Sequence, residues 1–282
     1  MVPTVVIAAH NEAAVIGRCL DALVDDRRAN DDLEIVVAAN GCTDHTVDVA
    51  QARPGVHVLD LPDAGKTAAF NAADLVATGF PRLYLDADIV VSRAGVDRLC
   101  AALEGPGAPL VATPGRRLDV RGRPWTVRAF YAVQRRLPVF DEGLFGRGLV
   151  ALSRAGRERF DTFPDLVADD LFLDSLFAPE ERLRLPEVVT EVATPTRTRD
   201  LYQRLVRVRR GNAALRAQGT DLGVAARSSD RWSWLRDVVV PHPWLAPAAV
   251  VYVGLTLLAD RAARRSPEVT TWGRDDSTRA EA

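Results

Sequence analysis

Apolar, β-branched runs alternate with amphipathic helical patterns through the first 115 residues, and this alternation constrains the fold more than any other feature. Apolar strands separated by helices are typical of a mostly parallel sheet that is covered by helices on both faces. The predicted strands are Thr4–Ala9, Glu34–Ala38, Val56–Leu59, Leu83–Asp86 and Leu110–Thr113. The predicted helices are Ala13–Val24, Thr43–Arg53, Lys66–Thr78 and Arg93–Leu103. We therefore predict an α/β fold with a Rossmann-like sheet.

The rest of the chain is less regular. Further helices are predicted near Trp125–Leu137, from Asp169 onward and over Thr198–Ala217, with one more strand at Val188–Val192. We expect residues 1–115 and 116–217 to be the two halves of one domain. Residues 218–282 are predicted to be a C-terminal tail, loop-like as far as residue 236 and then helical.

Composition and charge exclude several classes of protein. Hydrophobic residues make up 48% of the chain, which is enough for a substantial core. The net charge is -2, so the chain lacks the overall basic surface typical of nucleic-acid binding, and we expect no nucleic-acid partner. Three widely spaced cysteines fit a reducing cytosol. The first residues lack the pattern of a signal peptide, and we expect a cytoplasmic protein.

Polar residues follow each of the first four predicted strands at the point where the strand ends. In sheets of this kind, ligands bind beyond the carboxyl ends of the strands. We therefore expect these residues to converge on one site, and they are His10, Asn11, Glu12, Asn40, Asp44, Lys66, Asp86 and Asp88.

Asp86 and Asp88 follow the fourth strand and flank Ala87. Alternation along an extended chain places both carboxylates on the same side, with Ala87 pointing away. Two adjacent carboxylates repel each other and resist burial unless a cation offsets their charge. Mg²⁺ and Mn²⁺ take oxygen ligands that substrate phosphates commonly complete, so we predict a divalent-metal site at Asp86 and Asp88. The alternative is a helix-capping aspartate followed by a solvated one.

Seven segments, taken in order, resemble the family 2 glycosyltransferases. They are VVIAAHNEAAVIGRCLDAL, ANGCTDHT, GKTAAFNAA, LDADIVV, FGRG, VADDLFL and RLVRVRRGN, and together they span about residues 3–212. The resemblance implies the GT-A fold, a nucleotide-diphospho-sugar donor bound by residues 1–115, Mn²⁺ or Mg²⁺ at the Asp-x-Asp motif, and sugar transfer with inversion. It also implies a place at the cytosolic face of the cell membrane.

For the donor, the resemblance implies contacts from the turns at the strand ends. Asn11 and Glu12 match residues that contact the nucleoside, and Asp44 matches a residue that contacts base or ribose. Lys66 opens a helix where its charge can reach a diphosphate, and Asp88 matches the direct metal ligand. The full predicted donor-binding set is Ala9, His10, Asn11, Glu12, Asn40, Asp44, Lys66, Asp86, Ala87, Asp88, Arg207 and Arg210. Several of these also have a structural interpretation, as helix-terminal or surface residues.

Arg207 and Arg210 belong to an arginine-rich helix that resembles the family's Gln/Arg-x-x-Arg-Trp region, although the tryptophan is missing. Residues three and four apart share a helix face, so Arg204, Arg207 and Arg210 lie together while Arg209 does not. A guanidinium beside the departing diphosphate would stabilise its developing charge. The alternative is that these arginines are solvated surface residues.

Asp169 and Asp170 form a second acidic pair at the start of an apolar helix. The resemblance implies that the second acid of this pair is the general base, so we expect Asp170 to remove the acceptor's proton beside Asp169. Inversion needs a base on the face opposite the departing diphosphate. Crowding and partial burial are expected to raise one carboxylate pKa. Helix N-capping is the alternative interpretation.

The loop Phe145, Gly146, Arg147 and Gly148 matches the family position that lines the acceptor side. The second turn departs from the family, because Ala39 stands where most relatives carry an aspartate that contacts the base. This departure leaves the base open, and a UDP-sugar is our first expectation. The acceptor is expected to be a hydroxyl of a lipid-linked, glycan or small molecule.

The segment 244–259 is apolar, with basic residues after it and tryptophans beside it. Aromatic rings flanking such a segment suit a membrane interface, so we expect peripheral contact with the cytosolic leaflet. A core-packing helix, an oligomer contact and a true span are the alternatives; about 15 apolar residues fall short of the roughly 20 that a span needs.

Two rival functions remain. A sugar-phosphate nucleotidyltransferase would need a Gly-rich phosphate loop after the first strand, which AAHNEAAV lacks. A non-catalytic binding or scaffold protein of the same fold at the membrane is favoured by Ala39 but opposed by the intact aspartates of both acidic pairs. The sequence therefore favours a metal-dependent, inverting glycosyltransferase.

Overall fold

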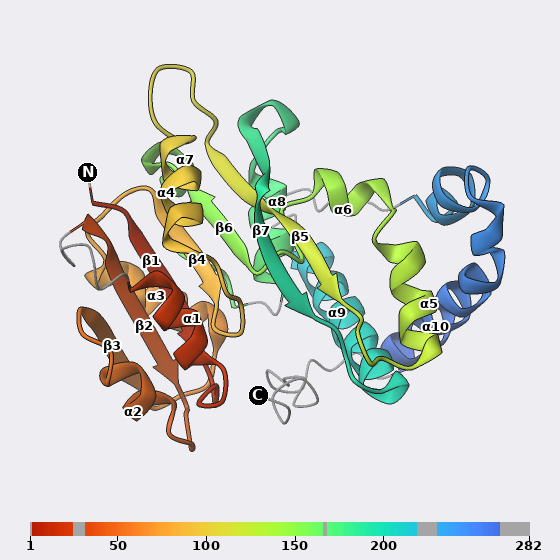
Figure 1. The fold of residues 1–282 in the computed structure, drawn as a ribbon, viewed down its shortest axis with the longest axis horizontal. Helices are drawn as coiled ribbons and strands as arrows, with labels where there is room; N and C mark the ends of the chain where they lie inside the picture. The colour runs from red at the N-terminus through yellow and green to blue at the C-terminus, as the bar shows by residue number, and fades with distance from the viewer. Residues whose placement is uncertain (1, 25–31, 166–167, 219–229, 266–282) are drawn as a thin grey trace.

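The computed structural model describes residues 2–24, 32–165, 168–218 and 230–265. A seven-stranded sheet runs through them in the order β3-β2-β1-β4-β6-β5-β7 (Figure 1). The strands are β1 Thr4–Ala9, β2 Glu34–Asn40, β3 Val56–Leu61, β4 Arg82–Asp86, β5 Val111–Asp119, β6 Leu149–Leu152 and β7 Arg182–Ala193. Strand β6 is antiparallel to both of its neighbours, and the other paired strands are parallel. The prediction of a mostly parallel sheet is confirmed.

Helices lie on both faces of the sheet (Figure 1). The first half contributes α1 Ile16–Leu23, α2 Thr46–Gln51, α3 Lys66–Val76 and α4 Arg93–Ala101. The second half contributes α5 Trp125–Gln134, α6 Pro138–Glu142, α7 Arg154–Arg157, α8 Asp169–Leu176, the 3₁₀ helix η2 Pro179–Glu181 and α9 Thr198–Gln218. The π-helix η3 Trp234–Val239, the 3₁₀ helix η4 Pro243–Leu245 and α10 Ala246–Arg265 follow.

Side-chain alternation along β1 divides the core into two layers. Val5 and Ile7 pack with Leu20 of α1 on one face of the sheet. Val6 packs with Phe70 of α3 on the other face. Both faces of β1 are buried, which explains why this strand is a continuous apolar run in the sequence.

Parallel pairing brings the carboxyl ends of β2, β1 and β4 to one edge of the sheet. Ala9 at the end of β1 lies opposite Ala39 of β2, and Ala8 lies opposite Asp86 of β4. The polar turns that follow these strands therefore adjoin one another, as expected of a site at this edge.

Strands β5 and β7 are longer than the apolar runs that predicted them. They pair side by side beyond Thr113, and Arg117 of β5 forms an ion pair with Glu191 of β7 at 2.9 Å. Cross-strand pairs of opposite charge support such a ladder without any apolar signal in the sequence. Strand β5 spans Val111–Asp119 and so includes residue 115, where we placed the boundary between the two halves of the domain. The division into two halves stays a prediction.

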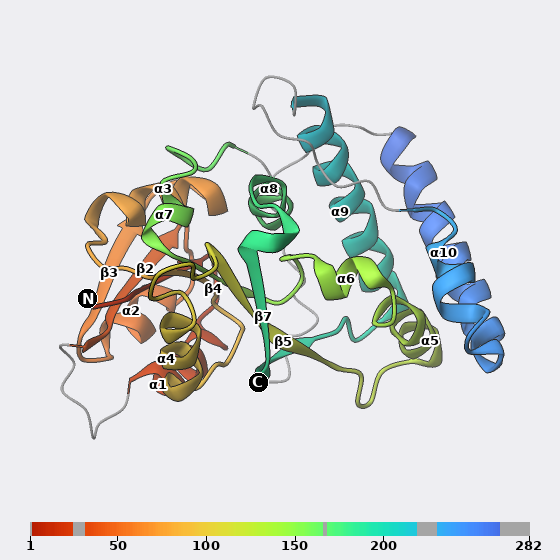
Figure 2. The ribbon, with the colours of Figure 1, turned by 90° about the horizontal axis from the view of Figure 1, so that it is seen from above.

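The C-terminal end of the described chain is a helical layer at one end of the molecule (Figure 2). Helix α10 packs on α5 and α9, where Tyr252 and Ala259 contact a cluster that includes Phe130 and Leu205. Within the described residues, one helix, Pro243–Arg265, is long and apolar enough by length and composition to cross a membrane. Residues 219–229 of the predicted loop lie outside the described residues.

Candidate active site

A cavity of about 400 Å³ opens at the carboxyl edge of the sheet, between the first strands, α8 and α9. It brings together residues from six of the seven sequence motifs. The predicted site residues that line it are His10, Glu12, Lys66, Asp86, Ala87, Asp88, Phe145, Gly146, Gly148, Asp169, Asp170 and Arg207. The geometry thus unites most of the predicted donor and catalytic residues in one place.

Lys66 links the two acidic pairs of the cavity. It is the first residue of α3, and the preceding Gly65 donates its N–H to the side chain of Asn40 at 2.9 Å. The Lys66 Nζ atom lies 2.7 Å from Asp86 Oδ1 and 2.8 Å from Asp169 Oδ2. Burial opposes the charge of the lysine, but the carboxylates of Asp169 and Asp86 outweigh it and raise the pKa of Lys66 above its usual range. The ammonium group therefore stays charged between the two acids.

Asp170 lies on α8 beside this cluster. Its Oδ1 atom accepts a hydrogen bond from the N–H of Leu171 at 2.8 Å, and its Oδ2 atom accepts one from the N–H of Gly146 at 3.2 Å. Burial and the negative charge of Asp169 raise the pKa of Asp170 to about 6, against the opposing effects of Lys66 and the Gly146 hydrogen bond. A carboxylate with this pKa can accept a proton near neutral pH.

The loop before β6 packs directly against the Asp-x-Asp motif. The carbonyl of Gly148 accepts a hydrogen bond from the N–H of Asp86 at 2.9 Å. Gly148 has a φ of +69°, and a Cβ atom there would come within 2.3 Å of Ile89 Cγ1. Only glycine adopts this positive φ easily and also fits beside Ile89 without a shift of the neighbouring chain. The loop and the Asp-x-Asp motif are therefore built as one unit.

Asp86 and Asp88 offer a donor set that suits a hard cation. Both side chains line the cavity and are half-buried, while Ala87 between them is buried. The described residues contain no group of three or more histidine, cysteine, aspartate or glutamate side chains placed to hold a metal ion. Two carboxylates from the protein leave the remaining ligand positions to a diphosphate, which is the pattern that Mg²⁺ prefers. The residues present thus fit Mn²⁺ or Mg²⁺ together with a substrate phosphate.

Four predicted donor residues do not line the cavity and instead connect the turns around it. Asn11 has a φ of +54°, and its Oδ1 atom accepts hydrogen bonds from the N–H groups of Thr43 at 2.7 Å and Asp44 at 3.2 Å. Asn40 is buried and donates to the carbonyl of Ala9 at 2.9 Å, and Ala9 itself is fully buried. Asp44 accepts from the N–H of Ala13 at 3.1 Å. Contact of these residues with a donor stays a prediction.

Two predicted arginines also lie outside the cavity lining. Arg147 is buried and donates to the carbonyls of Pro114, Phe140 and Asp141. Arg210 is half-buried and lies between Val208 and Gly211 of α9, which both line the cavity. Residues close to them in sequence do line the cavity. These are Gly146 and Gly148, on either side of Arg147, and Arg207, one turn before Arg210.

Several lining residues were missed by sequence reasoning as site residues. Arg204 lies one turn before Arg207 on the same helix face, so its helical spacing was the available signal. Phe140 and Leu144 also line the cavity, and their apolar side chains in a short helix and loop carry no sequence signal of a site. Phe140 and Leu144 add apolar surface to the lining of the cavity.

The sequence matches the family model described as glycosyl transferase family 2 over residues 4–154. This range covers more than half of the chain and includes β1 to β6 with the Asp-x-Asp motif. The chain belongs to glycosyl transferase family 2. No curated protein sequence matches it significantly.

Solved structures confirm the fold of this family 2 glycosyltransferase. The mannosyltransferase PcManGT from Pyrobaculum calidifontis, in complex with GDP-Man and Mn²⁺, is 22% identical with a TM-score of 0.60, and the match covers 94% of this chain and 75% of that one. TarS residues 1–349 from S. aureus, in complex with UDP, is 15% identical with a TM-score of 0.51, covering 98% and 95%.

A third similar structure is the glucosyl-3-phosphoglycerate synthase from Mycobacterium tuberculosis in complex with Mn²⁺, UDP and glucosyl-3-phosphoglycerate. It is 22% identical with a TM-score of 0.53, and the match covers 77% of this chain and 79% of that one. At these identities the likeness establishes the GT-A fold, and the predicted fold is confirmed.

Proposed function

We propose that this glycosyltransferase moves a sugar from a nucleotide-diphosphate donor to an acceptor hydroxyl with inversion at the anomeric carbon. The observation that carries the proposal is Asp170, a carboxylate with a pKa raised to about 6, which lines the same cavity as Asp86 and Asp88. The acceptor oxygen forms a bond to the anomeric carbon as the bond from that carbon to the diphosphate breaks. The acceptor proton passes to Asp170, and the electron pair of the broken bond leaves with the diphosphate.

The charged residues of the cavity divide between two tasks. Lys66 and Arg207 place positive charge where a departing diphosphate needs it. Asp86 and Asp88 would hold Mn²⁺ or Mg²⁺, whose positive charge would offset that of the phosphates. Asp169 holds Lys66 in place and, through its negative charge, helps to raise the pKa of Asp170.

The donor is proposed to be a UDP-sugar, with a GDP-sugar as the second choice. Because Ala39 replaces the aspartate that contacts the nucleotide base in most relatives, the sequence does not identify that base. Support for both bases comes from the similar structures, which contain GDP-Man or UDP. Two of these complexes also contain Mn²⁺.

A panel of UDP- and GDP-sugars incubated with the protein and Mn²⁺ tests the proposal. Mass spectrometry measures slow release of free sugar and nucleoside diphosphate by transfer to water. We expect one donor to be consumed in preference to the rest, and the Asp88→Asn variant to lose this activity. Failure of every donor to be consumed with either metal would contradict a catalytic role.

We also propose that the protein acts in the cytoplasm and contacts the membrane surface through α10. Val250, Leu257 and Leu258 are exposed on this helix, and Trp244 is exposed just before it. Arg261, Arg264 and Arg265 follow, and they complement an anionic lipid surface. The side of the helix that carries Tyr252 and Ala259 is packed on α5 and α9, which favours contact in the plane of the surface.

Sedimentation with vesicles that contain anionic phosphatidylglycerol tests this contact. We expect the double change Leu257→Asp and Leu258→Asp to reduce the bound fraction strongly. The change Leu75→Asp is a matched control, because Leu75 is also highly exposed but lies on α3. Equal loss of binding in both variants would contradict a specific role for α10.

A further inference from the structure

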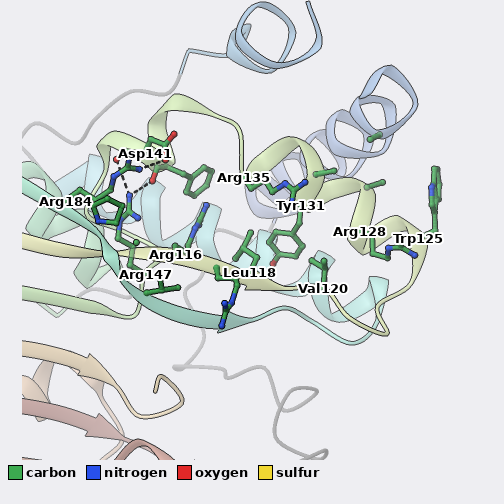
Figure 3. Close-up of a pocket in the computed structure, with 18 of the residues that line it drawn as sticks. Arg116, Leu118, Val120, Trp125, Arg128, Tyr131, Arg135, Asp141, Arg147 and Arg184 are labelled. Carbon is green, nitrogen blue, oxygen red and sulfur yellow. Dashed lines mark hydrogen bonds and ion pairs between the residues drawn. The ribbon is translucent and has the colours of Figure 1, made fainter. Parts of the chain in front are cut away.

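A second cavity of about 800 Å³ lies between strands β5 and β7 and the helices α5, α6 and α10 (Figure 3). Its lining is unusually rich in arginine, which no part of the proposed transfer reaction yet uses. The arginines that line it are Arg116, Arg117, Arg128, Arg135, Arg147 and Arg184, and Asp141 is the acidic residue among them.

Most of this positive charge is not neutralised by the described residues. Arg184 pairs with Asp141 at 2.6 Å and Arg117 pairs with Glu191 at 2.9 Å. No ion pair with a described carboxylate is made by the four remaining arginines of the lining, which are Arg116, Arg128, Arg135 and Arg147. Elsewhere in the described chain, arginines such as Arg53, Arg93 and Arg157 do pair with carboxylates. The cavity therefore carries a surplus of cationic side chains.

The two deepest arginines show the electrostatic effect of this surplus. Burial, together with the positive charges of Arg116 and Arg184, lowers the pKa of Arg147 to about 10. Burial also lowers the pKa of Arg116. An anion placed among these guanidinium groups would relieve both effects, because it offsets the like charges that crowd one another.

The lining of this cavity also includes aromatic and apolar side chains. Figure 3 shows Arg147, Arg184 and Asp141 together at one end and Trp125 at the opposite end. Trp125 is 61% exposed, and Trp244, which also lines the cavity, is 69% exposed. Pro247 and Ala248 of α10 also line the cavity, and Ala248 packs beside Leu137 and Phe140, at the opposite end of α5 from Trp125. The cavity therefore adjoins the helix that carries the exposed apolar residues. One ligand could therefore meet both cationic and apolar side chains within the same cavity.

The arginine cavity adjoins the active site at α6 and at the loop that follows it. Phe140 lines both cavities, and the guanidinium of Arg116 lies over its ring at 4.7 Å. Arg116 Nη1 lies 3.5 Å from the carbonyl oxygen of Gly146, whose N–H donates to Asp170. Gly146 therefore contacts both Arg116, which would hold an anion, and Asp170, the carboxylate that is proposed to act as the base.

We propose that this cavity binds the acceptor, and that the acceptor is a phosphate-bearing amphiphile. Its phosphate is held by Arg116, Arg128 and Arg135, and its apolar chain passes Trp244, Pro247 and Ala248 toward α10. Its reacting hydroxyl extends past Phe140 and Gly146 to Asp170. This inference rests on the proposed transferase function and adds the chemical class of the acceptor.

Binding of dodecyl phosphate to the full chain without metal tests the inference. Dodecyl maltoside is the neutral amphiphile and inorganic pyrophosphate is the anion without an apolar chain. The double variant Arg128→Gln and Arg135→Gln changes two exposed arginines, so its fold is expected to be retained. Arg98→Gln is the matched control, because Arg98 is exposed on α4, away from the cavity. Calorimetric titration below the micelle concentration gives the dissociation constants.

We expect the double variant to bind dodecyl phosphate at least tenfold more weakly than the wild type, and Arg98→Gln to bind it equally well. UDP with Mn²⁺ should leave dodecyl phosphate bound, because the arginines lie in a different cavity from Asp86 and Asp88. Unchanged affinity in the double variant, or equally tight binding of dodecyl maltoside, would overturn the inference. Pyrophosphate binding as tightly as dodecyl phosphate would overturn the amphiphile and leave a free-phosphate site.

A second measurement separates this inference from the proposed function. The shift in melting temperature caused by UDP or GDP with Mn²⁺ is recorded on the same preparation. If neither nucleotide shifts it while dodecyl phosphate binds at the arginines, the donor assignment fails and the ligand class of the cavity stands. If a nucleotide does shift it and dodecyl phosphate does not bind, the acceptor class is wrong.

Discussion

The backbone N–H of Gly146 donates a hydrogen bond to Asp170 at 3.2 Å, and this bond connects the loop before β6 to the carboxylate proposed as the base. The second carboxylate oxygen of Asp170 accepts from Leu171 at 2.8 Å. Both oxygens are thus oriented by backbone groups. A carboxylate held in this way keeps its direction toward the cavity while its pKa is set by burial and by Asp169.

The first prediction concerns the base. Asp170→Asn keeps the size of the side chain but removes its ability to accept the acceptor's proton. We expect transfer to fall by about 10²–10⁴-fold with donor affinity nearly unchanged. Single-turnover transfer and donor titration measure the two quantities. Asp165→Asn, at an exposed aspartate of the described chain, is the control. If Asp170→Asn lowers the rate of transfer by only a few-fold, another residue must act as the base.

The second prediction concerns the pH dependence of transfer. Asp170 must be deprotonated to act, so the single-turnover rate should rise with pH and level off above a midpoint near 6. The positive charge of Lys66 favours the charged form of Asp170, so Lys66→Met should move this midpoint to higher pH. Lys66→Arg retains the charge and should keep the midpoint. A profile that is identical in Lys66→Met and wild type would contradict this coupling.

The third prediction links the same carboxyl group to stability. The pKa of Asp170 is raised from 3.8 to about 6 in the folded protein, so the folded state binds a proton more tightly than the unfolded state. This contribution to stability is fully present below pH 3.8 and is lost as the pH rises through about 6. Asp170→Asn should therefore raise the melting temperature more at pH 8 than at pH 5. Calorimetry at the two pH values measures the difference, and equal shifts would contradict the burial of the charge.

The fourth prediction concerns the metal. UDP or GDP alone should raise the melting temperature weakly, and clearly more when Mn²⁺ is present, since the carboxylates and the diphosphate share the ion. Asp88→Asn should remove most of the additional shift while keeping the weak one. Differential scanning fluorimetry with and without chelator measures both. Equal shifts with and without Mn²⁺ in the wild type would count against the metal role of Asp86 and Asp88.

The fifth prediction compares two glycines of similar backbone conformation. Gly122 and Gly148 both have positive φ, of +66° and +69°, but a Cβ atom meets nothing within 4 Å at Gly122 and meets Ile89 at Gly148. Gly122→Ala should cost on the order of 1 kcal/mol of unfolding free energy. Gly148→Ala should cost at least about 2 kcal/mol more and should weaken nucleotide binding with Mn²⁺, because the loop contacts Asp86. Denaturant titration of both variants checks the difference.

The sheet and the acidic residues could be predicted from the sequence because both have local signals. Buried parallel strands are apolar runs, and β1 was placed at its observed bounds, Thr4–Ala9. Asp86, Asp88, Asp169 and Asp170 stand out because two adjacent acids at the end of an apolar element need an explanation. The extension of β5 to Asp119 could not be predicted, because it depends on pairing with a strand about 70 residues away.

The arginine cavity shows the limit of sequence reasoning more clearly. Its arginines come from β5, α5, the loop before β6 and β7, and no two of these segments form a recognisable motif. The arginine-dense stretch in α9 is prominent in the sequence, but only some of its arginines, such as Arg204 and Arg207, line the active site. Charge density along the chain is a poor guide to charge density in space when the fold gathers single residues from distant elements.

Lys66 has a consequence for which small anions the active site accepts. Its ammonium group contacts Asp86 and Asp169 at 2.7 and 2.8 Å. An inorganic phosphate that approaches must compete with two carboxylates already in place, so its binding is an exchange of partners and gains little. The abundant free phosphate of a cell is thereby a poor competitor, and occupancy is reserved for molecules whose nucleoside and sugar supply affinity of their own.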